Sequence, residues 1–82
     1  MPADAGFAAR FDALRRWRLE RARFEKKPAF TIATDRALED IATSDPATLE
    51  ALLDCHGIGP QKADKYGREI LDLLGRVRGR AA

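Results

Sequence analysis

The sequence predicts an all-α protein, a compact bundle of four to five helices. Apolar residues recur at helical spacing through most of the 82 residues, and proline and glycine interrupt this pattern at only a few places. No stretch shows the sustained alternation of apolar and polar residues that a half-buried strand would need. We therefore expect helices joined by short turns, without a sheet.

The first predicted helix covers residues 7–27. Its apolar stripe consists of Phe7, Phe11, Leu14, Trp17, Ala22 and Phe24. Arg10, Arg18 and Arg21 lie in or beside this stripe. Their aliphatic stems should cover it, while their charged heads reach water or a carboxylate such as Glu25.

A short apolar connector, residues 28–33, should follow the first helix. Proline at position 28 ends that helix, because the residue before a proline is pushed out of helical geometry. Thr34 is a good N-cap for a second helix that reaches about Thr43. The inward face of this second helix consists of Leu38, Ile41 and Ala42.

A third helix should begin near Pro46, a residue favoured in a first turn, with Ser44 or Asp45 as its cap. Its predicted buried face consists of Leu49, Leu52 and Leu53. The last helix should run from Pro60 to about Leu74. Its apolar face consists of Ala63, Tyr66, Ile70, Leu73 and Leu74.

Gly75 is placed to stop the last helix, which would leave residues 76–82 as a flexible basic tail. We find no internal repeat and no long linker. The sequence therefore predicts a single domain over residues 1–82, with a core of about residues 7–75.

Composition excludes several classes of protein. Cys55, the single cysteine, cannot form an intramolecular disulfide, and no Cys/His cluster has zinc spacing. The sequence contains no P-loop and no apolar run near the ~18 residues of a membrane span. We therefore expect a cytoplasmic protein that binds no metal or cofactor and contacts no membrane. So small a domain should unfold cooperatively as a monomer.

Charge is segregated along the chain. Residues 10–27 carry eight basic and three acidic side chains, a net of +5, whereas residues 34–54 carry one basic and six acidic side chains, a net of −5. This pattern favours an oriented encounter with a polyanion. Solvated helix faces are the simpler explanation, and the charges alone leave both open.

The stretch "CHGIGPQK" resembles a helix-hairpin-helix turn. Gly57 and Gly59 permit positive φ and leave their amides uncovered, and Pro60 presets the first turn of the next helix. Amides at a helix start attract phosphate, and Lys62 could add a charged contact. A tight connector whose glycines serve packing alone explains the same residues.

The order of elements resembles the HRDC domain, the helicase and RNase D C-terminal module. The matching signals are Leu14, Trp17 and Arg18, Pro28-Ala29-Phe30, Asp35 and Leu38, Leu52 and Leu53, Gly57-Ile58-Gly59, Lys62, and Tyr66-Gly67. The connector departs from the family pattern, because Thr31, Ile32 and Ala33 stand where members often have a branched-aromatic run. The resemblance implies a non-catalytic accessory domain that binds nucleic acid in RecQ-type helicases, some UvrD-like helicases and RNase D-type exonucleases.

The predicted DNA-binding residues come from the basic first helix, the connector and the hairpin. They are Arg15, Arg16, Arg23, Lys26, Lys27, Phe30, Gly57, Ile58, Gly59, Lys62 and Lys65. Phe30 could stack on a base, although plugging the core is the favoured role. Trp17 is expected in the core and His56 at the surface. Asp35, Glu39 and Asp40 do not form a two-metal set, so we expect no nuclease activity.

Two hypotheses of function remain. In the first, the domain binds single-stranded or partly duplex DNA for a parent helicase, most simply a bacterial RecQ-type enzyme that works at the nucleoid. In the second, the acidic flank of residues 34–54 docks on the parent enzyme and regulates it. An RNase D-type exonuclease is a further possible parent. The sequence favours the first hypothesis.

Overall fold

The structure, a computed structural model, describes residues 6–81 and contains five helices and no strand within that range. The helices are α1 (Phe7–Glu25), α2 (Ala29–Ile32), α3 (Asp35–Ser44), α4 (Leu49–Leu53) and α5 (Pro60–Ala81). The predicted all-α bundle is confirmed. Residues 1–5 and 82 of the predicted domain lie outside the described range.

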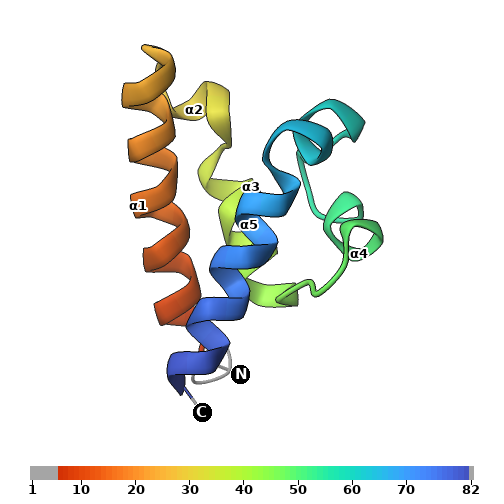
Figure 1. Ribbon diagram of the computed structural model, residues 1–82. Coiled ribbons are helices and arrows are strands. Elements are labelled where there is room, and N and C mark those ends of the chain that lie inside the picture. The colour runs from red at the N-terminus through yellow and green to blue at the C-terminus, as the bar shows by residue number, and fades with distance from the viewer. Residues whose placement is uncertain (1–5, 82) are drawn as a thin grey trace.

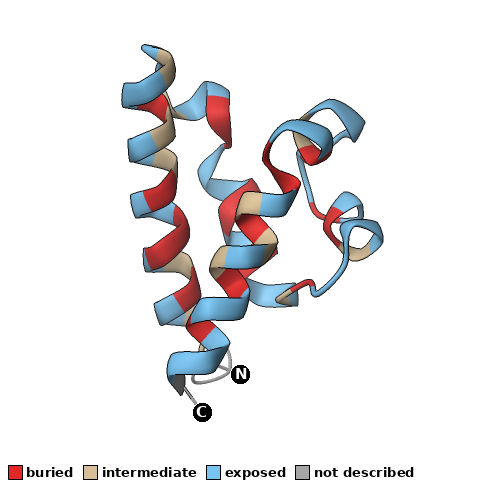
Figure 2. Cartoon of the chain, in the orientation of Figure 1, coloured by how far each residue is buried: buried red, intermediate tan, exposed pale blue. Residues whose placement is uncertain are grey.

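The two long helices form the frame of the bundle. Figure 1 shows α1 and α5 running in opposite directions, so the end of α5 lies near the start of α1. α1 packs against α2, α3 and α5, while α4 packs against α5. The fully buried side chains come from all five helices: Leu14, Ile32, Leu38, Ile41, Leu52, Ile70 and Leu74. Figure 2 shows that the buried positions of α1 and α5 face the interior.

α1 ends at Glu25, two residues earlier than predicted, in a left-handed cap that precedes Pro28. Lys26 takes a left-handed conformation with φ of 56°, and its N–H donates to the carbonyl of Arg23. The N–H of Lys27 donates to the carbonyl of Ala22 at 3.0 Å. These bonds satisfy the last carbonyls of the helix and turn the chain toward α2.

Two aromatic residues that the sequence placed inside lie outside. Phe24 is 78% exposed and Phe30 is 67% exposed. Residues 29–32, within the predicted apolar connector, form one helical turn, and this turn directs Ile32 inward. Ile32 and Ala33, both about 1% exposed, thus fill the space that Phe30 was expected to occupy.

The predicted N-cap of α3 is confirmed, since the hydroxyl of Thr34 accepts from the N–H of Ala37 at 3.2 Å. The prediction for α4 was wrong at its cap and partly wrong at its face. Thr48 caps this helix, and the earlier Asp45 instead ends α3 in a left-handed conformation. Only Leu52 of the three expected leucines is buried, because a helix of five residues presents a single inward position.

α5 does not stop at Gly75, so the predicted flexible tail was wrong for the described residues. The helix continues to Ala81. A helical glycine costs about 1 kcal/mol relative to alanine, but two contacts beyond Gly75 offset that cost. Val77 is buried, and Arg78 donates to Asp45 Oδ1 at 2.6 Å. Burial of a valine alone contributes roughly 1.5 kcal/mol.

Candidate nucleic-acid interface

Basic and aromatic side chains gather where α1 ends and α2 begins. Phe24 is in the last turn of α1, Lys26 and Lys27 follow it directly, and Phe30 is in the single turn of α2. All four are exposed, and α2 packs on α1. We call these four residues, together with Lys65 of α5, the aromatic-basic end.

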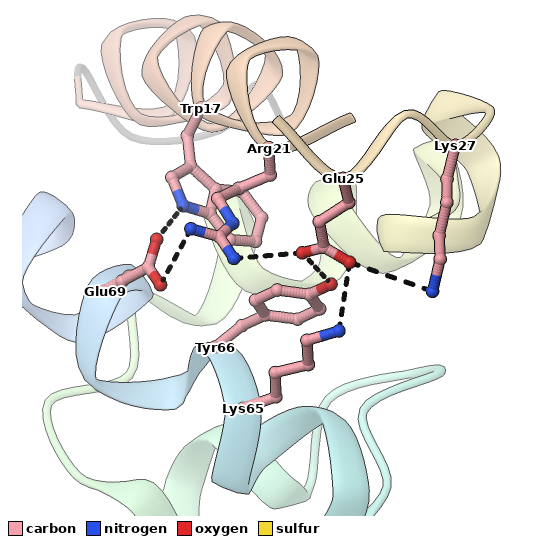
Figure 3. A network of polar contacts seen from close by, with 7 residues as sticks. All are labelled: Trp17, Arg21, Glu25, Lys27, Lys65, Tyr66 and Glu69. Atoms are coloured by element: carbon pink, nitrogen blue, oxygen red, sulfur yellow. Dashed lines mark hydrogen bonds and ion pairs between the residues drawn. The ribbon is translucent and has the colours of Figure 1, made fainter. Parts of the chain in front are cut away.

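Glu25 joins Lys65 to this end of α1 (Figure 3). One carboxylate oxygen accepts from Tyr66 Oη at 2.6 Å and from Arg21 Nη2 at 3.0 Å. The other accepts from Lys65 Nζ at 2.9 Å, and Lys27 Nζ lies 3.9 Å from it. Predicted binding residues from positions 27 and 65 therefore meet around one carboxylate.

The network changes the protonation of its members. The hydrogen bonds from Tyr66 and then Lys65 lower the pKa of Glu25 to about 2. The hydrogen bond to Glu25 raises the pKa of Lys65, and burial raises the pKa of Tyr66. Glu25 is therefore ionised and Lys65 charged at neutral pH. With Arg21 and Lys27 also beside Glu25, this carboxylate neutralises only part of the local positive charge.

The same network continues into the core. Trp17 is buried, as predicted, and its Nε1–H donates to Glu69 Oε1 at 3.0 Å. Its ring meets the ring of Tyr66 edge-on at a centroid distance of 5.5 Å. The hydroxyl of Tyr66 donates to Glu25. α1 and α5 are thus fixed to each other beside the aromatic-basic end.

The remaining predicted residues of α1 are exposed, but they do not all join this end. Arg23 directly precedes Phe24 in the last turn of α1. Arg15 lies over the ring of Phe11 at 5.8 Å, and Arg16 pairs with Asp12 at 3.0 Å. Arg15 and Arg16 therefore belong to the first half of α1, at a distance from Lys26 and Lys27.

The hairpin before α5 is tied to α3. Gly57 has φ of +76°, but Gly59 has no positive φ, so the expectation holds for one of the two glycines. Ile58, one of the predicted DNA-binding residues, is buried, so its side chain anchors the turn instead of facing a ligand. The N–H of His56 donates to Asp40 Oδ2 at 2.6 Å. A carboxylate of the protein thus already occupies one amide of the hairpin.

The surroundings of the hairpin are acidic. A cavity of about 280 Å³ beside it is lined by Arg36, Glu39, Asp40, Thr43 and His56. His56 is exposed, as predicted. Lys62, at the start of α5, is only half-exposed. This local charge opposes phosphate binding, so the hairpin is a weaker candidate than the aromatic-basic end.

Comparison with known proteins identifies the family. The model of the HRDC domain matches residues 7–74. The chain belongs to the HRDC domain family. It is 40% identical over 67 residues to the ATP-dependent DNA helicase UvrD2 of Mycobacterium tuberculosis, and 36% identical over 64 residues to the ATP-dependent DNA helicase RecQ of Bacillus subtilis. These matches cover 82% and 78% of this chain but only 9% and 11% of the relatives. No solved structure matches.

Family membership supports the expectation about catalysis, since HRDC is a non-catalytic accessory domain of helicases. Within residues 6–81, no group of three His, Cys, Asp or Glu side chains could hold a metal ion. In the same range no helix is long and apolar enough to cross a membrane. Cys55 is a buried free thiol, and burial raises its pKa.

Sequence reasoning missed three exposed residues of this HRDC domain. Phe24 was placed in the core, although it lies at the margin of the apolar arc and directly precedes Glu25 and two lysines. Arg76 and Arg80 were assigned to a tail, although their spacing of four residues puts them on one helical face. The position of Phe24 could be read from the sequence, but the shared face of Arg76 and Arg80 depended on α5 continuing past Gly75.

Proposed function

We propose that this HRDC domain is an accessory DNA-binding domain of a bacterial DNA helicase. Its role would be to hold single-stranded or partly duplex DNA, weakly and without sequence preference, near a helicase core in the same chain. The names of its relatives support a helicase, of the UvrD or RecQ type, over an RNase D-type exonuclease. The domain would act as one monomeric unit in the cytoplasm, at the nucleoid.

The observation that carries this proposal is the pair of exposed phenylalanines beside lysines. Phe24 and Phe30 are both more than half exposed, and Arg21 lies over the ring of Phe24 at 5.2 Å. Bases stack on such rings whatever their sequence, at roughly 1–3 kcal/mol per base. Lys26 and Lys27, next to both rings in the chain, supply the positive charge that phosphates require.

The number of cations bounds the affinity. Lys26, Lys27, Lys65 and Arg23 can contact about three or four phosphates. A slope of log affinity against log salt near −2 to −3 is expected for a single strand. The dissociation constant should be on the order of 10⁻⁴ to 10⁻⁶ M, the range of non-specific binding. Contacts of this kind position a strand without reading its sequence.

The test replaces both rings. The variant Phe24→Ala/Phe30→Ala should bind labelled single-stranded DNA at least about tenfold more weakly, because two stacking contacts are lost. Its salt slope should stay unchanged, since the lysines remain. The matched control is Leu19→Ala/Leu53→Ala, which removes two exposed apolar side chains elsewhere. Fluorescence anisotropy at several salt concentrations measures both quantities, and circular dichroism checks the helices.

Equal binding by the wild type and the Phe24/Phe30 variant would rule out stacking at this end. Failure of the wild type to bind any single strand at low salt would rule out the proposed function itself. Either result would favour the alternative hypothesis, in which the acidic flank docks on the parent enzyme.

The second candidate function is docking on the parent enzyme, and the acidic cavity beside the hairpin favours it. Glu39 is an exposed carboxylate lining that cavity, with Asp40 beside it. The variant Glu39→Lys should weaken association with a basic helicase core if this flank docks there. It should leave association unchanged if the domain acts through DNA alone.

A further inference from the structure

A second cluster of cations lies between α1 and α5, toward the end where α1 begins. Arg16, Arg76 and Arg80 line one groove of about 270 Å³. The other lining residues are Ala13, Trp17, Glu20, Leu73 and Val77. Three guanidinium groups thus face one carboxylate in this groove.

These arginines are weakly compensated in the free protein. Arg76 and Arg80 stand four residues apart on one helix, a spacing at which like charges destabilise the helix by a few tenths of a kcal/mol. Within residues 6–81, neither has an ion pair shorter than 4 Å. Arg16 pairs with Asp12, and both side chains are about two-thirds exposed, so that pair contributes little. An anion in the groove would relieve this repulsion.

The helical register aligns this cluster with the aromatic-basic end. On α1, Arg16 and Glu20 stand at i and i+4, on one face, whereas Lys27 follows the end of the helix at Glu25. On the antiparallel α5, Lys65 and Arg76 stand eleven residues apart, which places them on one face. Eleven residues of helix measure about 16 Å. Lys65 lies beside Lys27 through Glu25, and Arg76 shares a groove with Arg16. α5 therefore carries a cation at each end of this span, and each has a basic neighbour from α1 or from the turn that follows it.

We propose that a single strand of DNA follows the seam between α1 and α5. Its phosphates would be held by Lys27 and Lys65 at one end and by Arg16, Arg76 and Arg80 at the other. The inference rests on the proposed function and extends it to a second anchor. At roughly 3.4 Å per phosphate in a stacked strand, the span corresponds to about five nucleotides.

The chemistry of the groove favours a phosphodiester strand as its occupant. Guanidinium groups bind phosphate oxygens in a bidentate fork, so three of them suit a chain of phosphates. The groove and the contact of Lys65 with Glu25 also lie along the same two helices, α1 and α5. An acidic peptide shares the charge but would gain nothing from the exposed rings of Phe24 and Phe30.

The experiment removes the second anchor alone. The variant Arg76→Ala/Arg80→Ala is compared with Arg36→Ala/Arg68→Ala, which removes the same charge. Arg68 lines a different cavity, with Leu49 and Leu71, and Arg36 lies on α3. Binding is measured by anisotropy at several salt concentrations. The probes are oligothymidines of about four nucleotides, shorter than the span, and of about twelve nucleotides, longer than it.

The seam predicts a length-dependent loss. For the longer probe, the Arg76/Arg80 variant should lose about 1.4 from the salt slope, the share of two phosphates. For the shorter probe, held at the aromatic-basic end, its affinity should stay within about twofold of the wild type. The Arg36/Arg68 control should keep the wild-type slope on both probes.

Removing the negative charge of Glu20 gives an independent check, because it should strengthen binding. Glu20 lies in the groove and repels phosphates there. Glu20→Gln should therefore strengthen binding of the longer probe by a few-fold and leave the shorter probe unchanged. A merely structural role for this residue would not produce such a difference between probes.

Three results would overturn the seam. The Arg76/Arg80 variant could bind both probes as the wild type does, while the Phe24/Phe30 variant loses affinity; the proposed function would then stand without a second anchor. The groove could bind a labelled oligoglutamate peptide, with DNA binding unaffected by Arg76→Ala/Arg80→Ala; it would then be a site for a protein. Wild-type protein that binds neither probe would remove the seam and the proposed function together.

Discussion

Two turns of this molecule each contain a residue at positive φ, but the side chains around them differ in charge. The turn after α1 contains Lys26 at φ of 56°, and the hairpin before α5 contains Gly57 at φ of 76°. A carboxylate lies beside each turn: Glu25 directly precedes Lys26, and Asp40 comes from α3. Glu25 receives hydrogen bonds from three side chains, whereas Asp40 takes a main-chain amide of the hairpin.

The difference lies in the charge that remains. Around Glu25, the cations Arg21, Lys27 and Lys65 outnumber the carboxylate, although Glu69 compensates Arg21 from its other side. Around the hairpin, Asp40 is accompanied by Glu39 in the same cavity. A glycine hairpin at a helix start is therefore not sufficient for an anion site. The charge of the side chains that the fold places opposite the amides decides whether the turn attracts or repels an anion.

The largest effect should come from removing charge on the basic side of this comparison. Lys26→Gln/Lys27→Gln should reduce the salt slope for single-stranded DNA by about 1.4 and weaken binding on the order of tenfold at low salt. Lys62→Gln, on the hairpin, should reduce the slope by no more than about 0.7, one phosphate's share. Anisotropy titrations of both variants measure these slopes. A larger loss from Lys62 than from the lysine pair would reverse the ranking of the two turns.

A smaller effect, on stability, should come from the carboxylate that holds the hairpin. Asp40→Ala leaves the N–H of His56 without its acceptor and should destabilise the domain by about 1 kcal/mol, since the group is partly exposed. For a domain of this size, that is a fall in Tm of roughly 4–8 °C. Asp40→Asn keeps a carbonyl oxygen that can accept and should recover part of the loss. Thermal unfolding followed by circular dichroism tests the pair, and unchanged Tm in both variants would mean that the hairpin is held by Ile58 alone.

The smallest effect should be on stability at low pH, and it should come from Glu25. Its pKa in the folded protein, about 2, lies below the ordinary value of 4.5. The ionised form is therefore stabilised by folding, and this contribution is fully present above about pH 4.5 and is lost as pH falls toward 2. Glu25→Gln should be less stable at neutral pH and should show a flatter decline between pH 4.5 and 2. Urea unfolding at several pH values measures both curves, and parallel curves would exclude Glu25 as the titrating group.

The core of α1, the cap of α3 and the start of α5 could be predicted because they depend on neighbours in sequence. Helical spacing alone placed Leu14 and Trp17 inside, and the hydroxyl of Thr34 needed only the amide three residues on. Family membership was likewise predictable from the order of such elements. Local rules failed where a residue lay at the margin of an arc, as Phe24 does, or in a single turn, as Phe30 does.

The sequence by itself determined the helices, their order and the segregation of charge, because propensity, caps and periodicity act over a few residues. Only the tertiary structure decided which side chains meet across elements. It brought Lys65 to Lys27 around Glu25, set Asp40 against the hairpin, and carried α5 past Gly75 because Val77 is buried and Asp45 accepts from Arg78. Such contacts join residues tens of positions apart, so their energies depend on packing that no local pattern encodes.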